Sequence, residues 1–455
     1  MTKKSKTDLV KAEAATPRAG LLTGRYRLPT IGIVLTVTLL AFEAMAIGTV
    51  MPVVARDLDG LTLYGWSFSA MLIASMVATV LGGGWVDRAG PGRPLLSGLG
   101  VFVAGLLVAG GAPAMWVLVI GRTVQGVGVG LAMVALYVVI ARVYPEALRP
   151  RVFAATATAW VLPSLVGPAA GGLIAEHAHW RWVFLGLIPL VVPAALMLVP
   201  ALRGMGAPES DQDPPPRRVI PALVTAVAAA AVLYAVDDLA WPSVPAAIAG
   251  LAGLGWGLPK LLPAGALRLR RGVPTAVVLR GLLAGAFFGT DAFIPLALTS
   301  LHDFTPSQAG LVLTLASLGW SAASQYQGRS KRPRTFFVQT GAVFVAAGVV
   351  SAAVAIQVGG WWAAPAWIVG GLGMGMALSS LNVVVLNQSA PQEQGANSSA
   401  LQLSDTLGSS LAIGAAGALA TAFGADRLEI GLRVGAVLLI GIAAGAVLAA
   451  RRVKS

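Results

Sequence analysis

A stretch of about twenty apolar residues recurs from one end of this chain to the other. Wound as a helix, such a stretch crosses the roughly 30 Å hydrocarbon core of a bilayer. Only 11% of the 455 residues are charged and the mean hydropathy is +0.79, whereas soluble domains carry roughly 25% charged residues. We therefore expect one all-α integral membrane body with fourteen spans, at residues 30–53, 64–86, 95–112, 114–138, 152–175, 182–202, 219–236, 243–263, 274–299, 306–325, 335–357, 361–386, 397–423 and 430–450.

Basic residues gather in alternate loops between these spans. The intervening loops hold mainly Arg56, Arg181 and Arg427. Positively charged loops stay in the cytoplasm, and an even number of spans places both termini on that side. The net charge of +13 then reflects topology, and no nucleic-acid partner is expected. The basic loops contain Arg88, Arg93, Arg142, Arg149, Arg151, Arg203, Arg217, Arg218, Arg268, Arg270, Arg271, Arg329, Lys331, Arg332 and Arg334.

The composition also excludes several chemistries. The chain has no cysteine and three histidines, so we expect no disulfide, no thiol catalysis, no metal site and no cofactor. It contains no GxxxxGK[ST] phosphate-binding sequence, so energy for any transport must come from an ion gradient or a partner. The first span is too long for the apolar region of a signal peptide, and residues 1–28 are expected to be a polar tail.

Two pairs of segments indicate an internal repeat. "GVGVGLAMVALYVVIARVYPE" (126–146) is echoed by "GLGMGMALSSLNVVVLNQSAPQ" (371–392), and residues 50–75 are echoed by 293–317. Two six-helix halves in parallel repeat are a transporter architecture, with the ligand site between the halves near the middle of the membrane. The expected organisation is a cytoplasmic N-terminal tail 1–28, a first six-helix bundle 29–202, a cytoplasmic linker 203–218, an extra transmembrane hairpin 219–263, a second bundle 264–450 and a C-terminal tail 451–455.

Four stretches of the first half contain residues with a distinct physical role. In "GGWVDRAGPGR" (83–93), an acid at a helix end can pair with a basic neighbouring helix, and a glycine supplies a tight turn. In "GRTVQGVGVG" (121–130), an arginine lies about 10 Å inside its helix end. In "LVGPAAGGLIAEHAHWRWVF" (165–184), small residues allow close helix packing, and a proline bends the helix. In "FEAMAIGTVMPVVARDL" (42–58), an acid lies inside the first span.

Together these stretches resemble the major facilitator superfamily, specifically its fourteen-helix drug:proton antiporter branch. The resemblance implies a gating loop formed by Asp87, Arg88 and Gly90, although Pro91 and Gly92 stand where basic residues are usual. It implies that Arg122 couples proton movement to substrate movement. For the loop, the alternative is an ordinary basic turn. For Arg122, the alternative is a side chain that extends to the outer lipid headgroups.

The resemblance also identifies an antiporter helix motif, which consists of Gly167, Pro168, Gly171 and Gly172. We interpret it as a surface on which neighbouring helices pack closely and close the central cavity. The alternative is small-residue packing that has no relation to antiport. Trp180 and Trp182, in the "HWRWVF" that follows, are expected to anchor the chain at the membrane interface.

Three acids inside predicted spans are candidates for proton coupling together with Arg122: Glu43, Asp291 and Asp405. Burial favours the protonated form of a carboxyl group, so such groups can exchange a proton near neutral pH. Each acid could instead be a static partner of a hydroxyl or backbone group. Besides Glu43 and Asp291, the expected substrate cavity includes residues for which packing or helix–helix hydrogen bonding is the alternative, namely Gln125, Tyr137, Trp160, Asn382 and Asn387.

The resulting hypothesis is a secondary exporter in a bacterial cytoplasmic membrane. It would act as a monomer surrounded by lipid and exchange amphipathic, often cationic, small molecules for protons. The alternative within transport is a dedicated exporter of a native lipid, siderophore or metabolite. A membrane enzyme or receptor is a more remote alternative, since the chain has no serine nucleophile motif and no clustered His, Asp and Glu residues.

Overall fold

Every regular element that the structure describes is a helix. This computed structural model describes residues 20–453 apart from 147, 204, 206–218, 238–240 and 391–392. Most of the predicted linker 203–218, residues 1–19 of the predicted N-terminal tail and residues 454–455 lie outside the described residues. The helices are α2 (Arg27–Asp57), α3 (Tyr64–Ala89), α4 (Gly92–Gly110), α5 (Met115–Val143), α6 (Arg149–His177), α7 (Arg181–Leu185), α8 (Ile188–Leu202), α9 (Val219–Asp237), α10 (Val244–Leu261), α11 (Val273–Leu301), α12 (Pro306–Arg329), α13 (Arg334–Val358), α14 (Ala363–Gln388), α15 (Gln394–Thr421) and α16 (Leu428–Ala450).

Each of the fourteen predicted spans falls on one of these helices, with α7 and α8 sharing the span 182–202. Eleven helices of the described chain are long and apolar enough to cross a membrane, so the expected all-helical, multi-pass chain is confirmed. The helices α10, α12 and α15 do not meet these conditions of length and apolar composition. The last two carry many serine and glutamine residues, and they pack between the two halves of the protein, where part of their surface meets protein instead of lipid.

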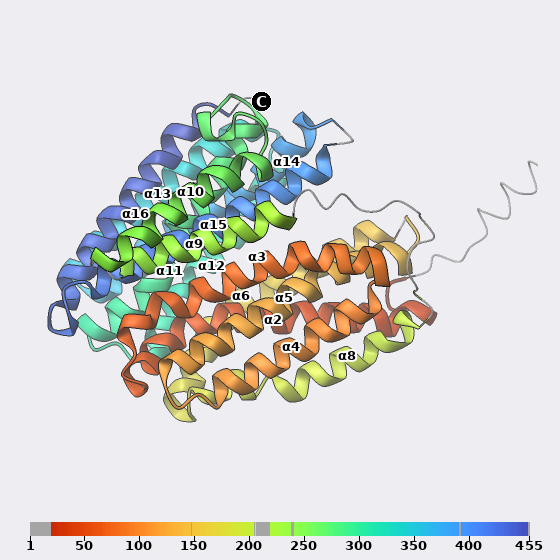
Figure 1. The fold of residues 1–455 in the computed structure, drawn as a ribbon, viewed down its shortest axis with the longest axis horizontal. Helices are drawn as coiled ribbons and strands as arrows, with labels where there is room; N and C mark the ends of the chain where they lie inside the picture. Colours follow the sequence, from red (N-terminus) through yellow and green to blue (C-terminus); the bar gives the residue numbers. More distant parts are fainter. Residues whose placement is uncertain are drawn as a thin grey trace, which may run out of the picture.

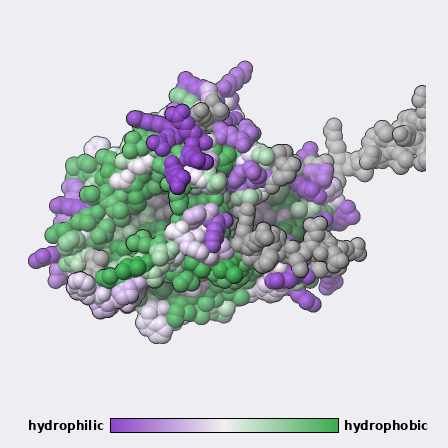
Figure 2. All heavy atoms as spheres, turned by 45° about the horizontal axis from the view of Figure 1, so that its top comes forward, coloured by the Kyte–Doolittle hydropathy of each residue, from purple (hydrophilic) through white to green (hydrophobic). Residues whose placement is uncertain are grey.

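The two halves of the chain use the same helix contacts. In the first half (α2–α8), α5 packs against α3 and α4, while α2 packs against α6 and α8. In the second half (α11–α16), α14 packs against α12 and α13, while α11 packs against α15 and α16. The repeated sequence therefore corresponds to a repeated packing pattern. Figure 2 shows hydrophobic side chains over a broad area of one face, with many hydrophilic ones toward its upper and right-hand sides.

The halves meet at one end of the molecule. We call the end where α2 begins and α16 ends the basic end, and the opposite end the far end. Near the far end, Arg56 Nη2 donates to the Thr299 carbonyl oxygen (2.6 Å), and the Tyr64 hydroxyl donates to the Ala292 carbonyl oxygen (2.8 Å). Among the described residues, every hydrogen bond between the halves lies on this side or near the middle of the helices. In Figure 1 the halves converge at the lower left and diverge toward the right and top.

Glycines at equivalent repeat positions form close contacts between the halves. A Cβ atom on Gly172 of α6 would lie 2.8 Å from Ser307 Cα, and one on Gly417 of α15 would lie 2.8 Å from Gly65 Cα. Real Cβ atoms do not approach so closely, so each position requires a glycine for this packing. The α6–α12 and α3–α15 contacts are thus the two matching sides of one interface.

The inserted hairpin lies over one of these sides. α9 packs against both α3 and α15, and α10 packs against α9. In Figure 1, α9 runs beside α15 and α3. Met76, Ala226, Ala229 and Leu407 form a buried apolar cluster that joins the three helices. The hairpin therefore contacts both halves of the protein.

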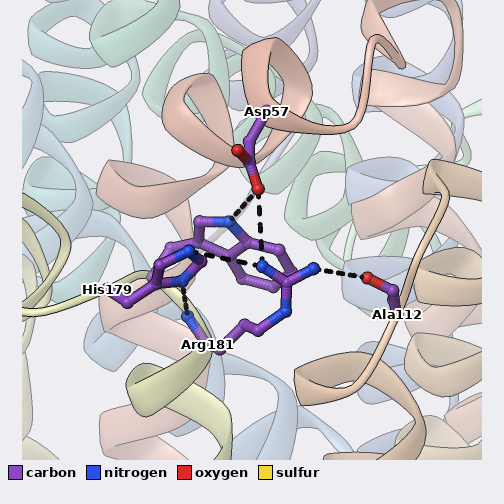
Figure 3. A network of polar contacts seen from close by, with 5 residues as sticks. Asp57, Ala112, His179 and Arg181 are labelled. Atoms are coloured by element: carbon purple, nitrogen blue, oxygen red, sulfur yellow. Dashed lines mark hydrogen bonds and ion pairs between the residues drawn. The ribbon is translucent and has the colours of Figure 1, made fainter.

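A polar network ties the first half together at its far end (Figure 3). Trp180 Nε1 donates to Asp57 Oδ2 (2.8 Å), Arg181 Nη1 lies 3.5 Å from the same oxygen, and Arg181 Nη2 donates to the Ala112 carbonyl oxygen (2.9 Å). Trp180 is only 2% exposed, so the expectation that it anchors at the membrane interface is wrong; its indole binds Asp57 instead. Trp182 is exposed.

The glycine contacts generate a prediction about which end of the protein opens. Gly172→Val should force the far end apart, because overpacking costs about 1–3 kcal/mol, which corresponds to a roughly tenfold shift between two states. Ser69, which donates a hydrogen bond to the Ser410 carbonyl oxygen across the interface, reports on this opening. Since the chain has no cysteine, Ser69→Cys supplies a unique label site, and its reaction with a membrane-impermeant maleimide should accelerate about tenfold.

The matched control is Gly445→Val in α16, because nothing lies within 4 Å of a Cβ atom at Gly445. It should leave the labelling rate unchanged. Equal labelling rates with Gly172→Val and Gly445→Val would show that the α6–α12 contact does not keep the far end closed.

Candidate functional site

A buried ion pair joins α2 and α5 in the first half. Arg122 Nη1 donates to Glu43 Oε1 and to Gln125 Oε1 (2.8 Å), and Arg122 Nε donates to the Ser67 carbonyl oxygen of α3 (3.0 Å). The Arg122 side chain is 2% exposed and that of Glu43 is 0% exposed. Arg122 therefore does not extend to the headgroups. Glu43, Arg122 and Gln125, which the sequence analysis selected separately, therefore lie in contact.

One oxygen of this carboxyl group remains available. Glu43 Oε2 is buried and has no hydrogen-bond partner among the described residues, and the same holds for Gln125 Nε2. Native proteins pair nearly all such groups, and an unpaired one is explained by a bound water or ion or by a role in binding or proton transfer. Glu43 can hold a proton on Oε2 while Oε1 still accepts from Arg122.

The second half places a different partner at the equivalent position. Trp367 Nε1 of α14 donates to Asp291 Oδ1 of α11 (2.7 Å). Aligning the repeated segments on Gly126 and Gly371 places Arg122 and Trp367 at the same repeat position. In each half, an acid on the first helix thus binds a donor on the fourth helix. Trp367 is neutral, however, and Asp291 forms no ion pair with any described residue.

Aromatic rings surround the donor of Asp291. Phe287 stacks on Trp367 with 4.7 Å between ring centroids, and the Trp320 ring meets Phe287 edge-on at 5.5 Å. Phe288 lies 5.4 Å from Phe287 and 6.2 Å from Trp320. Trp320, Phe288 and Asp291 are partly exposed. Aromatic faces near a carboxylate attract organic cations through the ring quadrupole and the negative charge together.

A second polar cluster lies toward the basic end of the second half. Arg280 Nε of α11 donates to Asp405 Oδ1 of α15 (2.5 Å), and Arg280 Nη1 donates to Asn382 Oδ1 of α14 (3.4 Å). The side chains of Arg280 and Asp405 are 12% and 16% exposed. Sequence reasoning selected Asp405 and Asn382 but missed Arg280. A lone arginine inside the predicted span 274–299 was the available signal.

The other predicted cavity residues lie apart from these clusters. Tyr137 and Trp160 are exposed, and the Tyr137 ring lies 6.0 Å from that of Phe153. Asn387 is exposed near the basic end of α14, where it lines a pocket of about 180 Å³ that also includes Arg334. Asn387 therefore lies apart from Glu43 and Asp291, the acids predicted to line the same cavity.

In the predicted gating loop, the acid and the arginine are both exposed. Gly90 follows α3 with φ of +74°, a conformation that residues with a Cβ atom rarely adopt. Asp87 and Arg88 are exposed, and Asp87 forms no ion pair with any described residue. The expected latch between this acid and a basic neighbouring helix is not formed in this conformation.

The predicted antiporter motif lies between two helices of different halves. Cβ atoms on Gly167 and Gly171 would meet Met45 and Ala46 of α2 at about 3 Å. On the other side, Gly310 of α12 lies against the Pro168 carbonyl group. The motif therefore lets α6 contact α2 within its own half and α12 across the interface.

Comparisons with known proteins agree with this architecture. The sequence model of the Major Facilitator Superfamily matches residues 33–413. A Mycobacterium tuberculosis protein named probable multidrug-efflux transporter is 28% identical over 417 residues, which cover 87% of this chain and 88% of that protein. The multidrug transporter protein MdtP of Bacillus subtilis is 30% identical over 173 residues, which cover 38% of this chain and 32% of that protein.

Solved structures share the fold. The POT family transporter PepTSo matches with a TM-score of 0.69 at 14% identity, over 93% of this chain and 96% of that chain. A peptide transporter POT in complex with alafosfalin matches with a TM-score of 0.69 at 13% identity, over 95% of this chain and 97% of that chain. The sequence match and the fold together show that this chain belongs to the Major Facilitator Superfamily and is a multi-pass membrane transporter.

Proposed function

We propose that this transporter is a proton-coupled antiporter that exports amphipathic, cationic small molecules. Asp291 carries this proposal: it is an intramembrane carboxyl group that accepts a hydrogen bond from the neutral Trp367 and lies near a partly exposed aromatic cluster. The names of the multidrug relatives support export of diverse small molecules.

The proposal includes the topology of the fourteen-helix branch. All fourteen helical spans cross a bacterial cytoplasmic membrane, with both termini and the basic end in the cytoplasm. Residues 29–202 and 264–450 form two bundles that swing about a central cavity. In the described conformation the far end is closed, so the cavity would be accessible from the cytoplasm.

Competition at Asp291 accounts for the exchange. With the carboxylate ionised, a cation that enters from the basic end binds between Asp291 and the aromatic rings. When the far end opens, a proton from outside neutralises the carboxylate, the electrostatic attraction is lost and the cation leaves. The protonated carrier returns and releases its proton to the cytoplasm.

Glu43 and Arg122 give the first half its own response to protons. Protonation of Glu43 removes the charge that balances Arg122, which remains buried between α2, α3 and α5. The helices that surround Arg122 then favour a different arrangement. The Arg280–Asp405 pair holds α11 against α15 near the basic end and stabilises the half that binds the cation.

Neutralising the proposed coupling acids tests the proton exchange. In inverted vesicles with an imposed pH gradient, Asp291→Asn and Glu43→Gln should each reduce proton-driven uptake of a fluorescent cationic dye about tenfold or more, which corresponds to the loss of a typical coupling free energy. Glu146→Gln is the control, because Glu146 is 90% exposed. Proton-driven uptake that persists in both variants, and still collapses with a protonophore, would refute the assignment of these carboxyl groups.

The aromatic cluster predicts a preference for cations. Trp320→Leu should raise the KM for a quaternary ammonium dye about tenfold, because cation–π contacts contribute roughly 0.5–2 kcal/mol. Trp320→Tyr should retain most of the affinity. A neutral dye of similar size serves as the internal control, and an equal loss for both dyes would show that Trp320 provides only apolar contact.

The buried ion pair predicts a non-additive stability pattern. Arg122→Met leaves the Glu43 carboxylate buried without its counter-ion, so the free energy of unfolding should fall by about 3–5 kcal/mol. The double variant Arg122→Met/Glu43→Gln should recover much of this loss, since no buried charge remains. Thermal unfolding in detergent measures the effect, and additive losses would contradict a coupled pair.

A further inference from the structure

The second half contains a pocket that the proposed transport cycle does not use. It has a volume of about 420 Å³, within the range of small-molecule sites, and it lies between α11, α13 and α16, with Ala416 of α15 also in its lining. All of its lining residues belong to the second half, so it is separate from the space between the halves. We infer that it binds one zwitterionic glycerophospholipid, with an acyl chain in the pocket and the headgroup at Arg433.

The pocket opens on the side of the protein that faces lipid. Val354 of α13 and Val437 of α16 line it and are 56% and 69% exposed. Figure 1 places α13 and α16 side by side at the outer edge of the second half. In a multi-pass membrane protein, such exposed valines meet hydrocarbon, so the molecules with free access to this opening are lipids.

The pocket is polar at one end and apolar along the rest of its length, as a phospholipid molecule is. Arg433 and Gln357 line it near the far end, whereas Val349, Leu439 and Ile440 line it nearer the middle of the helices. From Arg433 to Ile440 the helix rises about 10 Å, and half of a bilayer core is roughly 15 Å thick. A headgroup at Arg433 therefore places the acyl chain along the apolar part of the pocket within a single leaflet.

The deep part of the pocket offers nothing to a polar ligand. Thr290 is the polar residue on its α11 side, and its hydroxyl already donates to the Ala286 carbonyl oxygen (2.8 Å). Phe293, Ile294 and Leu439 complete that region. An apolar surface with no free donor suits a hydrocarbon chain better than water, which needs two to four polar partners.

The charges at the mouth match a zwitterionic headgroup. Arg433 uses Nε to donate to Gln357 Oε1 (2.7 Å) and Nη2 to donate to Glu429. Its Nη1 donates to no residue that the structure describes, so it can donate to a phosphate oxygen. The carboxylate of Glu429, which is 51% exposed, lies beside it and can accept from the ammonium group of the same lipid.

The occupant would lie against the helix that carries Asp291. Thr290, Phe293 and Ile294 of α11 line the pocket, and α11 also accepts the hydrogen bonds that Arg56 and Tyr64 donate across the halves. A bound acyl chain thus packs against the helix that also contacts the first half. This role requires only the membrane location of the protein and is independent of proton exchange.

Native mass spectrometry of the purified full chain tests the inference, with palmitoyl-oleoyl phosphatidylethanolamine as the probe. Ala436→Phe fills the pocket from α16, and Arg433→Gln removes the phosphate donor. Each should weaken binding of the first lipid molecule about tenfold, the scale of a lost charge-assisted hydrogen bond or of an excluded apolar group. Gly445→Phe on the same helix is the control, because nothing lies within 4 Å of a Cβ atom there, and it should bind as the unaltered protein does.

Thermal unfolding identifies any variant that fails to fold, and Ala353→Phe on α13 then replaces Ala436→Phe, since Ala353 also lines the pocket. Phosphatidylglycerol, which lacks the ammonium group, should bind more weakly than phosphatidylethanolamine to the unaltered protein. Equal lipid binding by the pocket-filling variants and by Gly445→Phe would overturn the acyl-chain site. A preference for phosphatidylglycerol would overturn the zwitterionic headgroup.

Discussion

Helices in lipid gain nothing by hiding apolar surface from one another, so the two halves of this transporter must be held by close backbone contact. That constraint explains why α6, in an otherwise apolar chain, carries Pro168 followed by two glycines. Gly171 lets α6 approach Ala46 of α2, and Gly172 lets it approach Pro306 and Ser307 of α12. The contact of Gly417 with Gly65 repeats the arrangement on the other side. A residue pattern that would destabilise a helix in water here creates the surface on which the halves meet.

The ionisable groups inside the bundles show that the two halves are not equivalent. Glu43 is balanced by Arg122, while Asp291, bound by a donor at the same repeat position, receives only the indole N–H of Trp367. A carboxylate opposite a guanidinium is stabilised in its charged form, whereas one opposite an indole keeps its negative charge available to a mobile cation. Repeat symmetry thus supplies a donor at the same position of each half, and the change from a guanidinium to an indole leaves Asp291 without the counter-ion that Glu43 has.

Much of the fold could be predicted from the sequence, because bilayer thickness sets the length of each span and the positions of Pro52 and Pro295 align the repeats. The partners of the buried acids could not. Glu43 and Arg122 are 79 residues apart, and their pairing depends on how α2 and α5 are turned toward each other. Arg280 was missed because apolar residues flank it on both sides, and a search for acids does not select it. Trp180 was misinterpreted because an aromatic residue near a helix end resembles an interface anchor until its burial against Asp57 is seen.

The free energy that holds the two halves together at the far end is small enough for ligand binding to change the conformation. Six hydrogen bonds join the halves among the described residues. Each contributes about 0.5–1.5 kcal/mol, so together they contribute roughly 3–9 kcal/mol. Reversing a two-state equilibrium from 1:99 to 99:1 requires about 5.5 kcal/mol, which lies inside that range. The glycine contacts add van der Waals packing between the backbones to these hydrogen bonds. An interface of this strength can be shifted by ligands whose binding free energies for the two conformations differ by about 5.5 kcal/mol.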